Sequence, residues 1–167
     1  LISCGAPDNR IAAVSTKAKN YGKTLLSTFF QPDQLTKSSS VITPVNSGDK
    51  KFLFWGAFGW LTWIQQQHGS PESMADLIVI EKIMARVLEL DETIENGAAD
   101  LFFGALYGSK PAMIGGDFER SRTHFERALE ISSREFLLVH TTFAETYCRM
   151  TFNQELHPVH CGELRGR

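Results

Sequence analysis

The chain has 167 residues, of which 43% are hydrophobic and 11% aromatic, a composition typical of a globular protein with a sizeable core. Lys and Arg number 17 against 19 Asp and Glu, so the net charge of −2 excludes a broad electrostatic attraction to nucleic acid or to an anionic membrane surface. The longest uncharged apolar segment covers residues 52–64, which is shorter than the roughly 18–20 residues of a membrane-spanning helix.

The first four residues, Leu-Ile-Ser-Cys, have the pattern that ends a bacterial lipoprotein signal. In such signals the peptidase requires a small residue next to the cleaved bond, and the thiol of the following cysteine accepts a diacylglyceryl group. This pattern predicts a lipoprotein tether over residues 1–10 with the lipid attached to Cys4, which would hold the protein at a membrane without spanning it. The alternative is that the sequence starts at an arbitrary point of a longer chain.

The rest of the chain reads as helices, because apolar residues recur three and four positions apart and no segment alternates with period two. Residues 31–50, rich in Ser, Thr and Pro, are expected to form a loop, and residues 151–167 an irregular tail. Ser70 followed by Pro71, and Asp117, are typical helix starts. We therefore expect an all-α domain over residues 11–150, with helices at 11–30, 52–67, 71–90, 94–107, 118–131 and 134–150.

Parts of the helical region resemble one another at a spacing of about 40 residues. Residues 84–91 (MARVLELD) resemble residues 125–132 (FERALEIS), and the Gly104-x2-Tyr107 pair resembles the Ala144-x2-Tyr147 pair. Such spacing indicates helix–turn–helix repeats. Because no second helix is visible after residue 150, the C-terminal hairpin is expected to be incomplete. An ordinary antiparallel helical bundle remains the alternative.

The order of small and large residues within one unit is that of a tetratricopeptide repeat (TPR). Gly104 and Tyr107 belong to its first helix, and Ser121, Phe125 and Ala128 to its second. Small residues let two helices approach and large ones fill the space between them. The pattern thus predicts a TPR-like α-solenoid of antiparallel hairpins, with Gly104, Asp117, Phe125, Ala128 and Tyr147 as structural residues.

Candidate binding residues lie in two places. Trp55, Trp60, Trp63 and Tyr107 either line an apolar binding channel or belong to the core. The long turn 108–116 either lines a surface for a ligand or partner or is only a connection, and Asp117 favours a helix cap there over a phosphate site. The residues of this turn that we single out are Ser109, Pro111, Gly115 and Gly116.

Signatures of catalysis are missing from the sequence. No nucleophile-and-base motif occurs, and His124 and Glu126 stand two positions apart on a predicted helix, so they do not face one another. His157, His160 and Cys161 lie in the tail, which is interpreted as a solvated segment rather than a metal site. We expect no catalytic residue, no metal and no cofactor. A small secreted enzyme using the three tail residues is the weakest hypothesis.

The stretch 104–117 (GALYGSKPAMIGGD), followed by HFERALE at residues 124–130, closely resembles the signature of the TRAP-transporter T-component family (TatT-like proteins). Lys110, Ser121 and the tail 159–167 depart from the family pattern. The resemblance implies a periplasmic lipoprotein with cryptic TPR-type repeats, attached to a membrane only through its lipid, and without catalytic activity. It also implies homotrimers and a role in solute uptake.

We therefore expect the protein to bind the solute-binding P subunit of a TRAP transporter, and with it an apolar or organic-acid ligand, but no nucleic acid. A generic TPR-like scaffold that binds a peptide or protein, with no transport role, is the alternative function.

Overall fold

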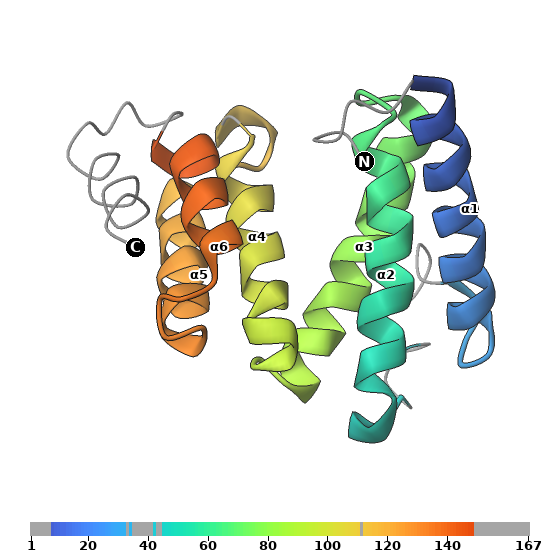
Figure 1. The fold of residues 1–167 in the computed structure, drawn as a ribbon, viewed down its shortest axis with the longest axis horizontal. Coiled ribbons are helices and arrows are strands. Elements are labelled where there is room, and N and C mark those ends of the chain that lie inside the picture. Colours follow the sequence, from blue (N-terminus) through green and yellow to red (C-terminus); the bar gives the residue numbers. More distant parts are fainter. Residues whose placement is uncertain (1–7, 33, 35–41, 43–44, 111, 149–167) are drawn as a thin grey trace. The chain divides into compact units, whose positions relative to one another are not determined.

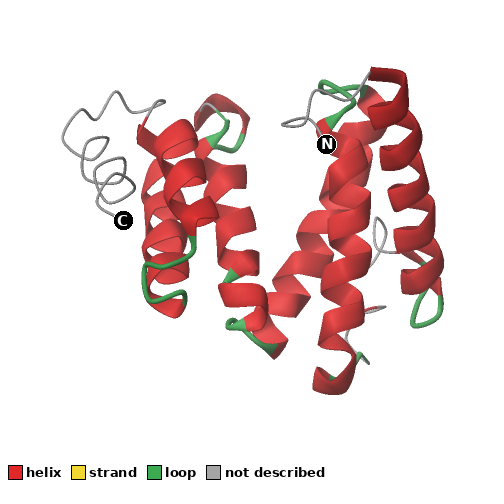
Figure 2. Cartoon of the chain, in the orientation of Figure 1, coloured by secondary structure: helices red, strands yellow, loops and turns green. Residues whose placement is uncertain are grey.

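The computed structural model describes residues 8–32, 34, 42, 45–110 and 112–148 (Figure 1). Over these residues it contains six α-helices and no strand, as Figure 2 shows, which confirms the all-helical prediction. The chain divides into two compact units, one ending at Asp91 and one beginning at Glu92. Their stacking into a TPR-like solenoid stays a prediction.

The first unit consists of helices α1 (Asp8–Ser27), α2 (Lys50–Gln65) and α3 (Pro71–Leu90). The predicted bounds of α3 are confirmed: Ser70 caps it with its hydroxyl oxygen, which accepts a hydrogen bond of 3.3 Å from the backbone N–H of Ser73, and Pro71 occupies the first turn. The helices α1 and α2 each begin and end two or three residues earlier than expected.

Small residues bring α1 and α2 into close contact along antiparallel paths. A Cβ atom on Gly22 would collide with the carbonyl oxygen of Gly56, and one on Gly59 would lie 3.0 Å from the carbonyl oxygen of Ala18. A Cβ on Gly56 would reach within 2.7 Å of the buried Leu26 side chain. The two backbones therefore pack against each other almost without intervening side chains.

In the connection between α1 and α2, the described residues form only turns and bends, and some of them belong to the core. Ile42 and Val45 are buried, and Arg86 of α3 donates a hydrogen bond of 3.1 Å to the carbonyl oxygen of Val45. A 3₁₀ turn over Ser47–Asp49 then leads into α2. These contacts attach the described end of the loop to α3.

The second unit contains α4 (Ala98–Gly108), α5 (Phe118–Ile131) and α6 (Leu137–Phe143). The bounds of α5 agree with the prediction, but the expected helix 94–107 is interrupted, because Glu95 and Asn96 within a 3₁₀ turn, and Gly97 directly after it, adopt positive φ angles. The expected helix 134–150 begins late for the same reason, since Ser133 and Arg134 have positive φ angles. After α6 the chain continues as a wider π-type turn over Ala144–Cys148.

The hairpin of α4 and α5 is held together by the predicted small and large residues. A Cβ on Gly104 would lie 3.0 Å from the ring of Phe125, and the hydroxyl of Ser121 donates a buried hydrogen bond of 2.7 Å to the carbonyl oxygen of Gly104. Phe125 also stacks on Phe143 of α6, with ring centroids 4.6 Å apart. The core of this unit consists of Leu101, Phe125, Ala128, Leu129, Val139 and Phe143.

The close contact of α1 and α2 leads to a stability prediction. Substituting Gly22→Ala should lower the free energy of unfolding by about 1–3 kcal/mol, because the added methyl group forces two backbones apart. Chemical denaturation followed by far-UV circular dichroism measures this difference. Gly48→Ala is the matched control, since a Cβ there meets nothing within 4 Å. Equal stability of the two variants would contradict the proposed backbone contact.

Candidate functional site

The three tryptophans of α2 occupy different environments. Trp60 and Trp63 are buried in the first unit, whereas Trp55 is 50% exposed. Burial favours the core alternative for Trp60 and Trp63, whose rings contact Lys23 and Lys19 of α1, and the binding channel stays a prediction. Trp55 is the member of this set that a ligand or partner can reach.

A buried lysine joins the three helices of the first unit. The ammonium group of Lys19 on α1 lies 2.8 Å from carboxylate oxygens of Asp76 and Glu72 on α3. It also lies 3.3 Å from the ring centroid of Trp63, in cation–π geometry. Trp60 donates a hydrogen bond of 2.8 Å from its indole N–H to Asp76. The ammonium group of Lys19 is thus neutralised and contacted by residues of the same unit.

The surroundings of Lys19 determine its protonation. Burial alone lowers the pKa of Lys19, but the hydrogen bonds and negative charges of Asp76 and Glu72 outweigh it, and the pKa lies above its ordinary value of 10.5. Asp76 is the more important partner, because it is mostly buried while Glu72 is largely exposed and screened by water. Lys19 is therefore a structural cation rather than a nucleophile.

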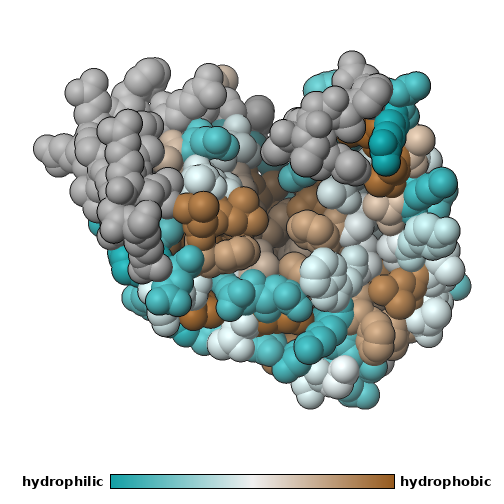
Figure 3. All heavy atoms as spheres, in the orientation of Figure 1, coloured by the Kyte–Doolittle hydropathy of each residue, from teal (hydrophilic) through white to brown (hydrophobic). Residues whose placement is uncertain are grey.

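Aromatic side chains are exposed along one side of α2. Trp55 and Phe58 contact each other edge to face at 5.7 Å, and Phe58 stacks on the buried Phe54 at 5.9 Å. Near the start of the helix, Phe52 stacks on Phe29 at 5.7 Å. We call the half-exposed residues Phe52, Trp55 and Phe58 the aromatic face of α2. Figure 3 shows hydrophobic side chains at the molecular surface among hydrophilic ones.

The turn between α4 and α5 is closed at its base. The backbone N–H of Asp117 donates to the carbonyl oxygen of Tyr107 at 3.2 Å, and the carboxylate of Asp117 accepts a bond of 3.0 Å from the backbone N–H of Arg120, so Asp117 caps α5 as expected. Met113 at the tip is 97% exposed. Of the other candidates in this turn, Ser109 and Gly115 are exposed and Gly116 is half-buried, while Pro111 lies outside the described residues.

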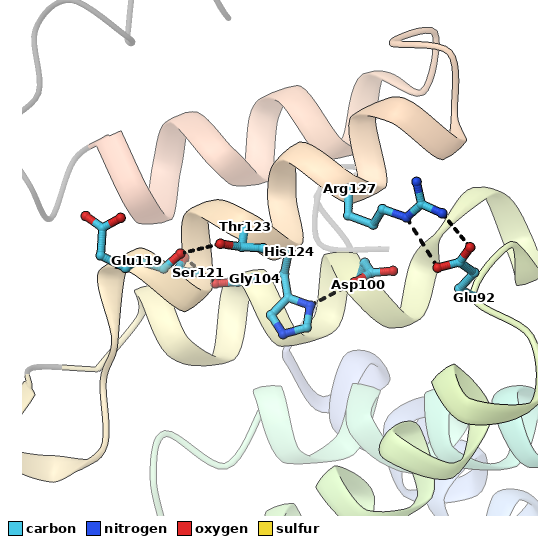
Figure 4. A network of polar contacts seen from close by, with 8 residues as sticks. All are labelled: Glu92, Asp100, Gly104, Glu119, Ser121, Thr123, His124 and Arg127. Carbon is cyan, nitrogen blue, oxygen red and sulfur yellow. Dashed lines mark hydrogen bonds and ion pairs between the residues drawn. The ribbon is translucent and has the colours of Figure 1, made fainter.

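A buried acid on α4 holds a histidine of α5 (Figure 4). Asp100 is only 3% exposed, and one of its carboxylate oxygens lies 2.7 Å from Nδ1 of His124. The other oxygen, Oδ2, is buried and has no hydrogen-bond partner among the described residues. In Figure 4 the second ring nitrogen of His124 points away from Asp100.

Aromatic rings and an arginine surround this pair. The ring of His124 stacks on Phe103 at 5.4 Å and on Tyr107 at 5.8 Å, both from α4. The guanidinium carbon of Arg120 lies 4.3 Å from the centroid of Tyr107, on its face. Arg120 and His124 are four positions apart on α5 and so lie on the same side of that helix. The Tyr107 ring therefore contacts two nitrogen-bearing side chains.

Sequence reasoning missed the Asp100–His124 pair, which joins residues 24 positions apart. One signal was present: Asp100 is a single charge within an otherwise apolar helix, and such a residue is rarely buried without a partner. The charged face of α5 is exposed to solvent. It carries ion pairs of Arg122 with Glu126 and of Arg127 with Glu92 and Glu130.

The remaining candidate residues lie elsewhere. Cys4 and the tail residues His157, His160 and Cys161 are outside the described residues, and Tyr147 lies in the Ala144–Cys148 turn with a side chain that is not described. Over the described ranges, no three His, Cys, Asp or Glu side chains are grouped so that they could hold a metal ion. Nor does any helix in this part of the chain combine the length and the apolar character required to cross a membrane.

Comparison with known protein families identifies a match. The model of the TRAP transporter T-component family matches residues 5–162, which is nearly the whole chain. No curated protein matches the sequence.

The buried cation leads to a prediction about stability and pH. Lys19→Met should lower the free energy of unfolding by about 3 kcal/mol, because it leaves Asp76 as a mostly buried charge without its cation. Since the pKa of Lys19 is raised on folding, its contribution is complete below pH 10.5 and is lost as the pH rises through the folded-state value. The difference between the two proteins should therefore shrink above pH 10.5.

Urea denaturation at several pH values measures this difference. Lys51→Met, at an exposed position of α2, is the control and should change stability by less than about 0.5 kcal/mol. A difference between wild type and Lys19→Met that stays constant through the alkaline range would contradict the assignment.

Proposed function

Because the chain belongs to the TRAP transporter T-component family, we propose that it is a periplasmic accessory subunit that binds the solute-binding P subunit of a TRAP-type uptake system. The family is an extracytoplasmic accessory of TRAP transport and is not known as a family of enzymes. The match over residues 5–162 is the observation that carries this proposal. The lipid on Cys4, the homotrimer and the binding of an apolar or organic-acid ligand are further parts of it.

The aromatic face of α2 supports a role in protein binding. Trp55, Phe52 and Phe58 are each between two-fifths and half exposed. Large aromatic side chains are enriched at the centres of protein interfaces, where their burial contributes most of the binding energy. Met113, at the tip of the turn between α4 and α5, is a second exposed apolar side chain of the kind that interfaces use. We place the contact with the P subunit on the aromatic face.

The double substitution Trp55→Ala and Phe58→Ala should weaken binding of the P subunit by at least about 30-fold, since one interface aromatic commonly contributes about 2 kcal/mol or more. The full-length protein would be co-expressed with the P subunit of a TRAP transporter from the same organism, and capture and isothermal titration would measure binding. Leu137→Ala removes an equally exposed apolar side chain of α6 and serves as the control.

The outcomes separate the candidate functions. Capture of the P subunit by wild type and by Leu137→Ala, but not by the double variant, supports the proposal. If wild type does not bind any P subunit, the accessory function is wrong and the generic TPR-like scaffold is favoured. If the double variant binds normally, the P subunit contacts another surface.

Lipid attachment is tested separately. The complete reading frame, expressed in bacteria with its own leader, should incorporate labelled palmitate and partition into the membrane fraction, because a diacylglyceryl group and an acyl chain together anchor a protein stably. Cys4→Ser should abolish both labelling and partitioning. Cys148→Ser is the control. Labelling that persists in Cys4→Ser would contradict the anchor.

A further inference from the structure

We propose that His124, Tyr107 and Arg120 form a binding site for the carboxylate group of a small organic acid, and that the buried Asp100 positions the imidazole of His124 for this contact. All four residues belong to α4 and α5, a hairpin closed by the Gly104–Phe125 packing and the Ser121 hydrogen bond. The proposal assigns the organic-acid part of the proposed function to named residues, and it rests on that part.

The first argument is the buried acid. A carboxylate that is removed from water and lacks a partner on one oxygen destabilises the fold, so its burial in the first turn of the otherwise apolar helix α4 requires an explanation. Asp100 accepts the hydrogen of Nδ1 and thereby fixes the orientation of the ring of His124. In the protonated imidazole both nitrogens donate, so Nε2 can donate to a ligand while Nδ1 stays with Asp100.

The second argument is the surroundings of Nε2. This nitrogen points away from Asp100 and makes no hydrogen bond to a described residue of either helix, while contacts with the rings of Phe103 and Tyr107 restrain the imidazole. Arg120 sits against the same tyrosine ring, which holds its planar guanidinium in place. An arginine fork and an imidazole N–H on adjacent turns of one helix match the two oxygens of a carboxylate.

The third argument is the distribution of charge. The other cations on the exposed side of α5 are already paired, Arg122 with Glu126 and Arg127 with Glu92 and Glu130. Arg120 contacts no carboxylate within the described residues, and its neighbour Glu119 is the one acidic group of the first turn of α5. Asp100 is paired with His124 and not with Arg120, so the charge of Arg120 remains available for an anionic ligand.

Binding of two probes tests the proposal. Phenylacetate combines a carboxylate with an aromatic ring, and phenylacetamide is its uncharged counterpart of the same shape. We expect saturable binding of phenylacetate to the full-length protein at constant ionic strength. Calorimetry and the shifts of the His124 side-chain NMR signals measure this binding. Phenylacetamide should bind at least about tenfold more weakly, because it lacks the charge-assisted hydrogen bonds.

Three variants test the assigned roles. Arg120→Gln and His124→Gln should each weaken phenylacetate binding by about tenfold or more. Asp100→Asn should also weaken phenylacetate binding and should change the ¹⁵N signals that report the tautomer of His124. If Asp100 were a purely structural acid, its substitution would leave phenylacetate binding unchanged. Arg122→Gln, an exposed arginine two positions along α5, is the control and should change binding by less than about twofold.

The proposal is wrong if phenylacetate does not bind saturably, if phenylacetamide binds equally well, or if Arg122→Gln weakens binding as much as Arg120→Gln does. Because Arg120 is exposed, its substitution does not threaten the fold. Arg120→Gln should also leave capture of the P subunit unchanged, so failure of this site is distinguishable from failure of the accessory function.

Discussion

The close approach of helix backbones through small residues is the constraint on which the rest of the structure depends. In the first unit, Gly22 and Gly56 let α1 and α2 touch, and in the second, Gly104 lets the ring of Phe125 lie directly against α4. Other side chains of these helices lie away from the closest contacts. Trp55 and Phe58 of α2 are half-exposed, and His124 of α5 is only partly buried beside Asp100.

Both units also place a charge where the helices meet. The ammonium group of Lys19 forms ion pairs with two acids and a cation–π contact with the ring of Trp63. Asp100 differs, since one of its oxygens has no hydrogen-bond partner among the described residues. A fully satisfied buried network specifies a fold, whereas a partly satisfied one stabilises it poorly. We therefore propose different roles for the two networks, a structural one in the first unit and a ligand-binding one in the second.

Much of the fold was predictable from local signals, and the site was not. The bounds of α3 and α5 followed from Ser70 with Pro71 and from Asp117, which are residues that start helices. The interruptions before α4 and α6 were missed, because Glu95 and Arg134 adopt positive φ angles although Glu and Arg are not residue types that predict them. The ion pairs of Lys19 and the Asp100–His124 pair were missed because the paired residues are distant in sequence. Helical periodicity predicts which residues are buried but not which residues contact each other.

The stability of the α4–α5 hairpin depends little on the number of residues in the turn that connects the two helices. Its two ends are joined by the bond between the Asp117 amide and the Tyr107 carbonyl, so the helices do not depend on the residues in between. For such a closed segment, doubling the number of residues costs only about 0.6 kcal/mol of chain entropy. The tip at Met113 is accordingly a place where a reporter peptide or fluorophore can be inserted while the hairpin beneath it keeps its geometry.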